Sequence, residues 1–447
     1  MVTPGETGCD PEREPVAQRS PGPAARIPRP ADVARAATRA PREFIVDPSD
    51  QGAYPEIDPA VAAAEDGDRV IVRPGTYRLP VVVDRAIELV GDGPRETIIL
   101  EPAGAEALSL CASGAVVRNL TIRPATVGND GTTYSAVMVR DVVATVEDCD
   151  LTSHLGATVW VGGGSSRATI RHCRIHDGSQ NGVAVWDEGT AVVEDSEITR
   201  HRWPGVMAHG GRTSATVRGC RLLDNLDMGA AANEGATLIV ERSLVARNAQ
   251  CGIVLDGATP SSRVEDNDIE ENGEAGVLVR GGIGGRVLRN RLRRNNVGVV
   301  SVEAATPQIA ANEVVDHLGP AIVVAGARTD PIVSDNVLVG ARSASIVVSG
   351  GGAGRFERNR ITADRQPGAW IQEEGTSPTF IENVITGSTL IAIAITGHAG
   401  GAFERNDLRG NKGGAWDLDE AGPVQLNGNL EDPRPAPDSP GSAGYLN

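Results

Sequence analysis

Residues able to bind a ligand or transfer a proton are concentrated in one stretch, residues 154–209. The chain has 7 histidines and 5 tryptophans, and most of them lie here: His154, His172, His176, His201 and His209, with Trp160, Trp186 and Trp203. An exposed indole beside imidazole and carboxylate groups is a common way to hold a sugar, because the ring packs on the apolar face of the sugar and the polar groups bond to its hydroxyls. A histidine beside a carboxylate can also act as an acid–base pair.

This stretch supplies two sets of candidates. The acid–base candidates are Asp187, Glu188, His201 and His209. The ligand-binding candidates are Trp160, Trp186, Trp203, His154, His176 and Asp177, joined further along the chain by Asn233 and Asp256. Two alternatives stay open for the same residues: an interface with another protein, or a purely structural role at the edge of the fold.

Several other chemistries are disfavoured. The histidines fall on different strands and turns, and the 6 cysteines occur singly, so we expect no metal site and no cofactor. Lys412 is the one lysine, which leaves almost no scope for a Schiff base. The net charge of −17 disfavours nucleic acid as a partner and would repel a polyuronate.

A repeating element must position these residues. From residue 144 onward the pattern apolar-x-(Glu/Arg)-x-(Cys/Ser/Asn)-x-(Ile/Leu/Val), then a polar turn and Gly-Val-x-Val, recurs every 22 to 24 residues. Short β-branched runs at this period, without a helical pattern, predict a parallel β-helix with three strands in each turn. We therefore expect a single all-β solenoid of about 14 turns, with about 23 residues in each.

The small polar position of the repeat predicts a ladder of stacked side chains. It falls at Cys149, Cys173, Ser196, Cys220, Ser243, Asn267, Asn290, Asn312, Asn336, Asn359, Asn383 and Asn406, with Asn429 as a further rung. Stacked amides bond to one another and to the backbone of a tight bend, where polar groups would otherwise be buried unpaired. The cysteines in the early turns are interpreted as small buried residues. A second file, Asn225, Asn248, Asn272 and Asn295, predicts another ladder five residues later.

Composition agrees with a narrow core. The chain has 54 glycines but only 3% aromatic residues, too few to fill the cores of ordinary domains of this total length. Val, Ile, Leu and Ala fill the interior of a thin solenoid, and Gly permits the turns between its strands.

In the Gly-Val-x-Val strand the two valine positions should face inward and the position between them outward. That outward position is mostly apolar: Trp160, Ala184, Met207, Ala231, Val254, Leu278, Val300, Val323, Val347, Trp370 and Ala394. An exposed stripe of this length would exceed what a monomer normally tolerates, so we expect a partner, a second copy of the chain or its own tail to cover it. The next outward column, Trp186, His209, Asn233, Asp256 and Arg280, is polar and would form a rim.

The first ordered segment carries a family resemblance. Residues 57–65 predict a short helix, with Asp58 as its cap and Pro59 at its first position, which would close the open end of the solenoid. Residues 57–77 and 91–98 resemble the opening of the pectin lyase-like superfamily, through Ile57, Ala60, Val61, Ala63, Ala64, Gly67, Asp68, Pro74, Gly75, Thr76 and Tyr77, then Gly91, Asp92, Gly93, Pro94, Thr97 and Ile98. The resemblance covers residues 44–430 and implies a right-handed parallel β-helix.

The resemblance implies no particular activity. The esterase segments of the DFIFG and LGRPW types are missing, and so are the NTD, DD, GHG and RIK motifs of the polygalacturonases; AHGGR at 208–212 does not match them. The set of calcium-binding acids of the pectate lyases is not recognisable either. This superfamily includes both enzymes and non-catalytic modules.

The ends of the chain predict three regions. Residues 1–43 are rich in Pro, Ala and Arg and are interpreted as a disordered leader, residues 44–430 as the β-helix, and residues 431–447 as a disordered tail. No signal peptide and no membrane-spanning run is recognisable, so we expect a cytoplasmic protein without a membrane partner.

Two functions remain in competition. The first, which we favour, is a non-catalytic module that binds a protein or a glycan through the outer face of the Gly-Val-x-Val sheet. The second is a carbohydrate-active enzyme (a polysaccharide lyase, glycoside hydrolase or epimerase) with its acid–base site around residues 154–209. Missing catalytic motifs favour the first, and the clustered histidines favour the second.

Overall fold

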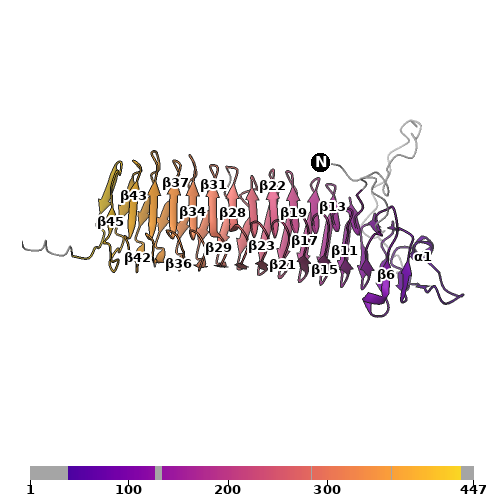
Figure 1. Cartoon of the computed structure of the whole chain (residues 1–447). Helices are drawn as coiled ribbons and strands as arrows, with labels where there is room; N and C mark the ends of the chain where they lie inside the picture. The colour runs from indigo at the N-terminus through magenta and orange to yellow at the C-terminus, as the bar shows by residue number, and fades with distance from the viewer. Residues whose placement is uncertain (1–38, 126–132, 283, 364, 434–447) are drawn as a thin grey trace, which may run out of the picture.

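The computed structural model describes residues 39–125, 133–282, 284–363 and 365–433, and these form one straight rod (Figure 1). Three long parallel sheets, here named A, B and C, run the length of the rod and contain 17, 14 and 15 strands. Of the predicted leader, residues 1–43, and the predicted tail, residues 431–447, the parts 1–38 and 434–447 lie outside the described residues. The end of the predicted leader is described, and Glu43 is already the first residue of a strand.

Sheet A consists of β1 (Glu43–Val46), β2 (Arg69–Val72), β5 (Glu88–Gly91), β8 (Ala115–Arg118), β11 (Val143–Glu147), β14 (Arg167–Arg171), β17 (Thr190–Glu194), β20 (Ser214–Arg218), β23 (Thr237–Glu241), β26 (Arg263–Glu265), β29 (Arg286–Leu288), β32 (Gln308–Ala310), β35 (Ile332–Ser334), β38 (Arg355–Glu357), β41 (Thr379–Ile381), β44 (Gly401–Glu404) and β46 (Val424–Asn427). Sheet B consists of β3 (Gly75–Tyr77), β6 (Ile98–Leu100), β9 (Thr121–Ile122), β12 (Asp150–Leu151), β15 (Arg174–His176), β18 (Glu197–Thr199), β21 (Arg221–Leu223), β24 (Leu244–Ala246), β27 (Asp268–Glu270), β30 (Arg291–Arg293), β33 (Glu313–Val315), β36 (Val337–Val339), β39 (Arg360–Thr362) and β42 (Val384–Thr386). Sheet C consists of β4 (Val81–Val83), β7 (Leu108–Leu110), β10 (Val137–Arg140), β13 (Val159–Gly162), β16 (Val183–Trp186), β19 (Val206–His209), β22 (Ala230–Asn233), β25 (Ile253–Asp256), β28 (Ala275–Arg280), β31 (Val297–Val302), β34 (Ile322–Ala325), β37 (Ile346–Ser349), β40 (Ala369–Gln372), β43 (Ile393–Thr396) and β45 (Trp416–Asp417).

The chain visits the sheets in the order A, B, C and pairs each strand in parallel with the same strand of the next turn. In sheet C, for example, Val159 lies opposite Val183 and Val183 opposite Val206, which is the spacing of the sequence repeat. Within the described residues, 14 turns contribute a strand to every sheet, and incomplete turns extend both ends. The predicted all-β parallel solenoid is therefore confirmed. The incomplete turns at its two ends make it longer than the 14 turns predicted.

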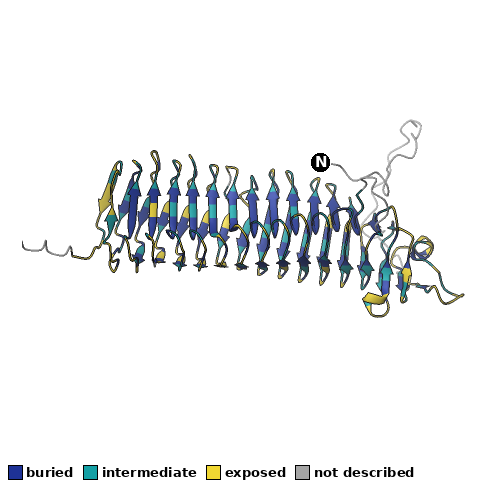
Figure 2. Ribbon diagram, in the orientation of Figure 1, coloured by how far each residue is buried: buried dark blue, intermediate teal, exposed yellow. Residues whose placement is uncertain are grey.

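The core is a continuous apolar column inside the three sheets. Buried positions accordingly recur in the strands along the length of the rod (Figure 2). Alternate residues of every strand point into it, and most of them are Val, Ile, Leu or Ala. Aromatic rings enter the core mainly in the last turns, where Phe356 stacks on Phe380 at 4.4 Å and Phe380 on Phe403 at 5.5 Å. The core is as narrow as the low aromatic content predicts.

Two buried ladders hold the bends between sheets. Where sheet A meets sheet B, the amide of Asn336 donates to Asn359 Oδ1 at 2.9 Å and to the carbonyl of Ile309 at 2.9 Å. Its own Oδ1 accepts the backbone N–H and the amide of Asn312, both at 2.9 Å. Nearest the N-terminus the same position is taken by Cys149, Cys173 and Cys220, which are buried free thiols bonded to backbone carbonyls. The predicted ladder and the structural role of its cysteines are confirmed.

The second ladder occupies the bend between sheets B and C. Asn225, Asn248, Asn272 and Asn295 bond to one another through their side chains at 2.9 Å. A histidine continues the file at each end: His201 donates its backbone N–H to Asn225 Oδ1 at 3.0 Å, and His317 contacts the carbonyl of Asn295 at 3.2 Å. The second ladder is therefore longer than the four asparagines predicted, because it includes His201 and His317.

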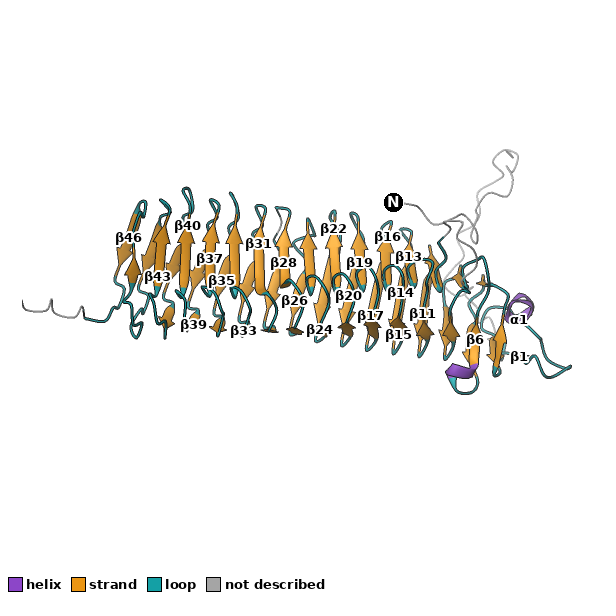
Figure 3. Cartoon of the chain, viewed as in Figure 1, coloured by secondary structure: helices purple, strands orange, loops and turns teal. Residues whose placement is uncertain are grey.

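Helices are almost absent from the rod (Figure 3). The helix α1 (Ile57–Ala63) lies at the N-terminal end, where Ile57, Ala60 and Val61 are buried against the first turn. The prediction that Asp58 caps this helix is wrong, because the cap residue is Glu56 and no side chain bonds to the helix start there. A single-turn 3₁₀ helix, η1 (Arg95–Thr97), precedes β6. Among the described residues, no helix is long and apolar enough to cross a bilayer.

Candidate functional site

The outer face of sheet C carries two columns of side chains. The apolar stripe is the outward position from Trp160 to Ala394 named above, and the polar column consists of Trp186, His209, Asn233, Asp256 and Arg280. Two clusters of apolar residues on this face are separate from the core column, and they contain Trp160, Ala184, Ala231 and Val254 of the stripe. The predicted outward direction of these positions is confirmed.

The extent of the exposed stripe is corrected. Most of its members are buried or half-buried, because neighbours such as Met228, Cys251 and Ala275 at the start of each strand pack beside them. Trp370, 39% exposed, is the one large stripe residue that the described structure leaves open to solvent. The argument for a partner or a second copy that covers a long patch therefore loses most of its basis.

The polar column contains a connected group centred on His209. The Trp186 indole packs on the His209 ring with centroids 4.2 Å apart, and His209 Nδ1 lies 2.7 Å from Asn233 Oδ1. The other ring nitrogen, Nε2, faces the carboxylate of Glu234 at 3.6 Å. The His209 side chain is 18% exposed. It is therefore held in one orientation at the surface, between an aromatic ring and polar groups.

The neighbours of this group complete a surface of mixed charge. Asp256 lies two turns after His209 in the column, and it accepts a hydrogen bond of 2.8 Å from Arg280 of the following turn. In the turn after β16, Asp187 is exposed and Glu188 pairs with Arg212 of the next turn. Asp187 and Glu188 both adopt the left-handed conformation, with φ of 48° and 66°, so this bend projects two acidic side chains beside Trp186.

Trp160 does not offer a free ring. It is 8% exposed, packs among Met138, Ala157 and Ala184, and has the guanidinium of Arg140 5.2 Å from its ring centre. Its role on this face is packing, which leaves Trp186 as the indole nearest to the polar groups.

The prediction that His201 transfers protons to a substrate is wrong. Its side chain is fully buried, with Nε2 3.2 Å from the carbonyl of Ile175 and Nδ1 without a partner among the described residues. Burial lowers the pKa of His201 to about 4. It belongs to the second ladder, buried inside the bend before β19, where a substrate on the outer face cannot reach it.

Four other predicted residues lie along the bend between sheets B and C rather than beside His209. His176 bonds to Asp150 at 2.8 Å and to Asp177 at 2.6 Å. Arg200 donates from Nε and Nη2 to the two carboxylate oxygens of Asp177, at 2.6 and 2.8 Å. The hydrogen bonds from Arg200 hold the pKa of Asp177 well below its usual range. His154 and Trp203 are exposed in turns of the same bend, before β13 and β19. The predicted residues therefore form two groups and one buried rung rather than a single site.

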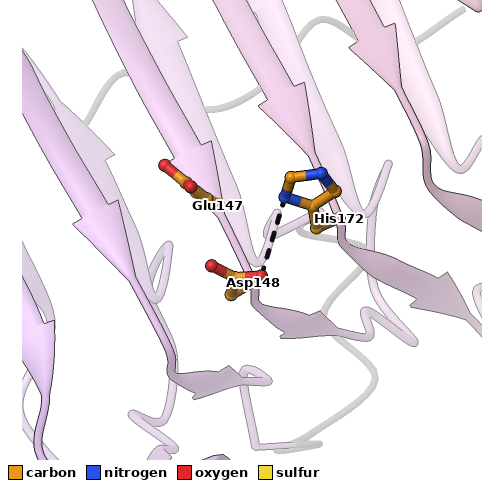
Figure 4. A group of neighbouring side chains, drawn as sticks. All are labelled: Glu147, Asp148 and His172. Atoms are coloured by element: carbon orange, nitrogen blue, oxygen red, sulfur yellow. Dashed lines mark ion pairs between the residues drawn. The ribbon is translucent and has the colours of Figure 1, made fainter.

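Sequence reasoning missed a group at the bend between sheets A and B. Glu147, Asp148 and His172 bring potential ligand atoms within 4.8 Å of one another (Figure 4). The available signal was the position of His172, directly before the ladder residue Cys173, where several later turns have arginine. These three residues are of the types that bind metal ions, whereas the sequence led us to expect no metal site.

The comparisons with known proteins agree with the architecture. Residues 108–262 match the family model described as right handed beta helix region. The chain is a right-handed parallel β-helix. No curated protein matches this β-helix.

Solved structures similar to the β-helix include the A-module of a mannuronan C-5 epimerase from Azotobacter vinelandii, with 14% identity, a TM-score of 0.40 and coverage of 85% of this chain and 95% of that chain. A pectate lyase has 17% identity, a TM-score of 0.42 and coverage of 61% and 75%. A pectin methyl esterase of the rice weevil has 12% identity, a TM-score of 0.37 and coverage of 47% and 78%. These similarities are too weak to indicate a function. The function proposed below is argued from the residues of this β-helix alone.

Proposed function

We propose that the β-helix binds a glycan, without catalysis, on the outer face of sheet C around Trp186 and His209. The observation that supports this most is the contact of 4.2 Å between these two rings, beside Asn233 and Asp256 in the same column. A half-buried indole edge with an amide, an imidazole and a carboxylate next to it supplies an apolar platform together with donors and acceptors for hydroxyl groups.

The charges around this column favour a neutral glycan. Asp187, Glu188, Glu234 and Asp256 are acidic. The arginines beside them in the described structure, Arg212 and Arg280, are each already paired with one of these acids. With a net charge of −17 on the whole chain, a polyanion would meet repulsion both at long range and at the site.

The test compares two tryptophans on the same sheet. We expect Trp186→Ala to weaken binding of a neutral oligosaccharide by about tenfold, about 1.4 kcal/mol, which is the size of a stacking contact. Trp370→Ala removes an equally large ring from the apolar stripe, where its Nε1 donates to Thr396 at 3.1 Å, and should leave the affinity unchanged. Binding would be measured by calorimetry with oligosaccharides selected on a glycan array, after urea unfolding has shown that both variants fold.

Two results would contradict the proposal. One is that no glycan on the array binds the wild-type chain. The other is that Trp370→Ala lowers the affinity as much as Trp186→Ala, which would place the ligand elsewhere on the sheet.

One observation favours the alternative, an acid–base site of a lyase, hydrolase or epimerase. Asn233 holds His209 Nδ1, and the opposite nitrogen faces Glu234 at the surface, an arrangement that can relay a proton. If this were the function, polysaccharides incubated with the chain would yield new reducing ends, unsaturated products or epimerised units, and His209→Gln would abolish them. We favour binding alone because both nitrogens of His209 already face protein groups.

A further inference from the structure

The bend between sheets A and B presents a second file of side chains beside the asparagine ladder. Each residue of this file directly precedes a ladder residue and adopts the left-handed conformation; Asp148, His172 and Asp195 have φ of 55°, 53° and 47°. Their side chains project into solvent one above the other along the rod.

At three later places in this file, an acid and an arginine neutralise one another. Arg289 binds both oxygens of Asp266 at 2.8 and 2.9 Å, and Arg358 binds both oxygens of Asp335 at the same distances. Arg405 binds Glu382 at 3.1 Å. The usual arrangement is thus an acid followed, one turn later, by an arginine that forks onto it.

His172 breaks this arrangement. It follows Asp148 where an arginine would be expected, and Asp195 is followed by Gly219, which has no side chain to offer. Among the described residues, neither Asp148 nor Asp195 has an ion pair with arginine, and each faces only His172. Two carboxylates are therefore left without a matching cation at this point of the file.

The distances around His172 suit a metal ion better than hydrogen bonds. Nδ1 lies 3.7 Å from Asp148 Oδ1, and Nε2 lies 3.9 Å from Asp195 Oδ2. Both separations are too long for a hydrogen bond. The separation between Nδ1 and Asp148 is also shorter than about 4.2 Å, which is twice the metal–ligand bond of about 2.1 Å that nitrogen and carboxylate ligands form with zinc, so one ion can reach both atoms.

Glu147 supplies a third ligand atom on the same side of the imidazole (Figure 4). Arg171 and Arg118 both contact its Oε2, at 2.8 and 3.4 Å. These contacts fix the carboxylate, and no described residue bonds to the other oxygen, Oε1.

We propose that Glu147, Asp148 and His172 bind a divalent transition-metal ion, with Zn²⁺ the best match to one nitrogen and two carboxylate ligands. His172 coordinates through Nδ1. Asp195 is not a ligand, since it faces the other ring nitrogen, Nε2, at 3.9 Å.

The ion would be accessible to water, because Asp148 and His172 are both exposed. Water molecules can therefore complete the coordination of the metal. A cavity of about 270 Å³ lies on the other side of His172, where Asp195 and Gly219 contribute to its lining.

The experiment is a titration of the full chain with Zn²⁺ by calorimetry, after removal of metals with a chelator. We expect one saturable site per chain, and we expect His172→Asn and Asp148→Asn to weaken it by at least about tenfold, since even loss of an outer partner typically costs that much. His398→Asn is the matched control, because His398 is also exposed and left-handed, with φ of 59°, and lies in the turn after β43. Asparagine tolerates this backbone conformation, so all three variants should fold.

Each further arm supports or overturns the proposal. Affinity should fall as the pH is lowered, because a coordinating imidazole must lose its proton. Ca²⁺ and Mg²⁺, which prefer oxygen ligands, should bind much more weakly than Zn²⁺. The proposal is overturned if no saturable site is found, if His172→Asn and Asp148→Asn bind as the wild type does, or if Ca²⁺ binds as tightly as Zn²⁺.

Discussion

His201 and His209 are eight residues apart and have opposite environments. His201 is a rung of a ladder inside the bend, whereas His209 lies on the outer face of β19 with both nitrogens near polar groups. The period of two along a strand could place His209 outward. His201 precedes the strand, so only its distance from the next ladder residue, Asn225, indicates that it is buried.

The buried His201 should make stability depend on pH. Its pKa is about 4 in the folded chain and 6.5 in an unfolded one, because burial disfavours the charged ring. The unfolded state therefore takes up a proton first, so the stability contributed by the neutral ring is complete above pH 6.5 and is lost as the pH falls towards 4, up to about 3 kcal/mol. We expect His201→Asn to reduce this loss, measured as the free energy of unfolding in urea between pH 7 and pH 4.5.

His398→Asn serves as the control for this measurement, since it makes the same replacement at a histidine that lies exposed in the turn after β43. Some dependence should persist in His201→Asn, because burial also lowers the pKa of His317. An unchanged slope in His201→Asn would show that the ring is not held neutral by burial.

At the scale of the element, each turn is defined by its ladder residue. Asparagine is suited to this position because its amide donates to the next rung and to a strand carbonyl while its oxygen accepts from the rung before. Serine satisfies part of the same set: Ser243 Oγ accepts the N–H of Cys220 at 3.1 Å and donates to the carbonyl of Glu241 at 2.9 Å.

Removing one rung should destabilise the whole rod. Asn336→Ala leaves the N–H and the amide of Asn312 and the carbonyl of Ile309 without their partners, all of them buried. We expect a loss of about 3 kcal/mol or more in the free energy of unfolding, since each unpaired buried group costs about 1–3 kcal/mol. Asn336→Ser should lose less, as Ser243 indicates, and Asn427→Ala, at an exposed position, should lose almost nothing. Equal stability of the alanine and serine variants would contradict this account.

The elements could be predicted wherever the repeat is regular. From residue 144 the period fixed the turns, the ladder and the inward positions, and the structure agrees with all three. The early turns lack the ladder residue, so their strands could be anticipated only through the family resemblance. The burial of the apolar stripe could not be predicted. Residues such as Met228 and Cys251 pack against it, and they precede the strands, where the alternation of inward and outward side chains does not apply.

The same limit applies to the candidate sites. Parity along sheet C brings Trp186, His209, Asn233 and Asp256 into one column, and this could be read from the repeat. The group around His172 could not be predicted in the same way. His172 stands out only when the residues of the A–B bend are aligned turn by turn, because several later turns have arginine at its position.

At the scale of the whole molecule, the two ends differ. At the N-terminal end β1 pairs with β2 and α1 packs against the first turn. At the other end of the described chain, β44, β45 and β46 belong to turns without a strand in sheet B, and Leu418, Leu426 and Leu430 are exposed. In a solenoid each turn is stabilised only by its neighbours, so an incomplete end opens most easily.

Hydrogen exchange should therefore show a gradient along the rod. We expect the amides of residues 401–433 to exchange first, protection to rise towards the middle turns, and β2 to stay protected under α1. Mass spectrometry of peptides from 401–433, 253–302 and 57–77 would measure this. Uniform exchange across the three regions would mean that the rod opens as one unit.

The in-register ladder also makes the length of the rod adjustable. A cut from one rung to the next, for example deletion of residues 313–336, joins Asn312 directly to Val337 and restores the same strand order. A deletion that does not run from one rung to another would put the following strands out of register with the turn before them, and an odd shift would turn inward-facing side chains outward. Whole turns are thus the natural unit by which such a chain can be shortened or extended while the faces built from other turns stay intact.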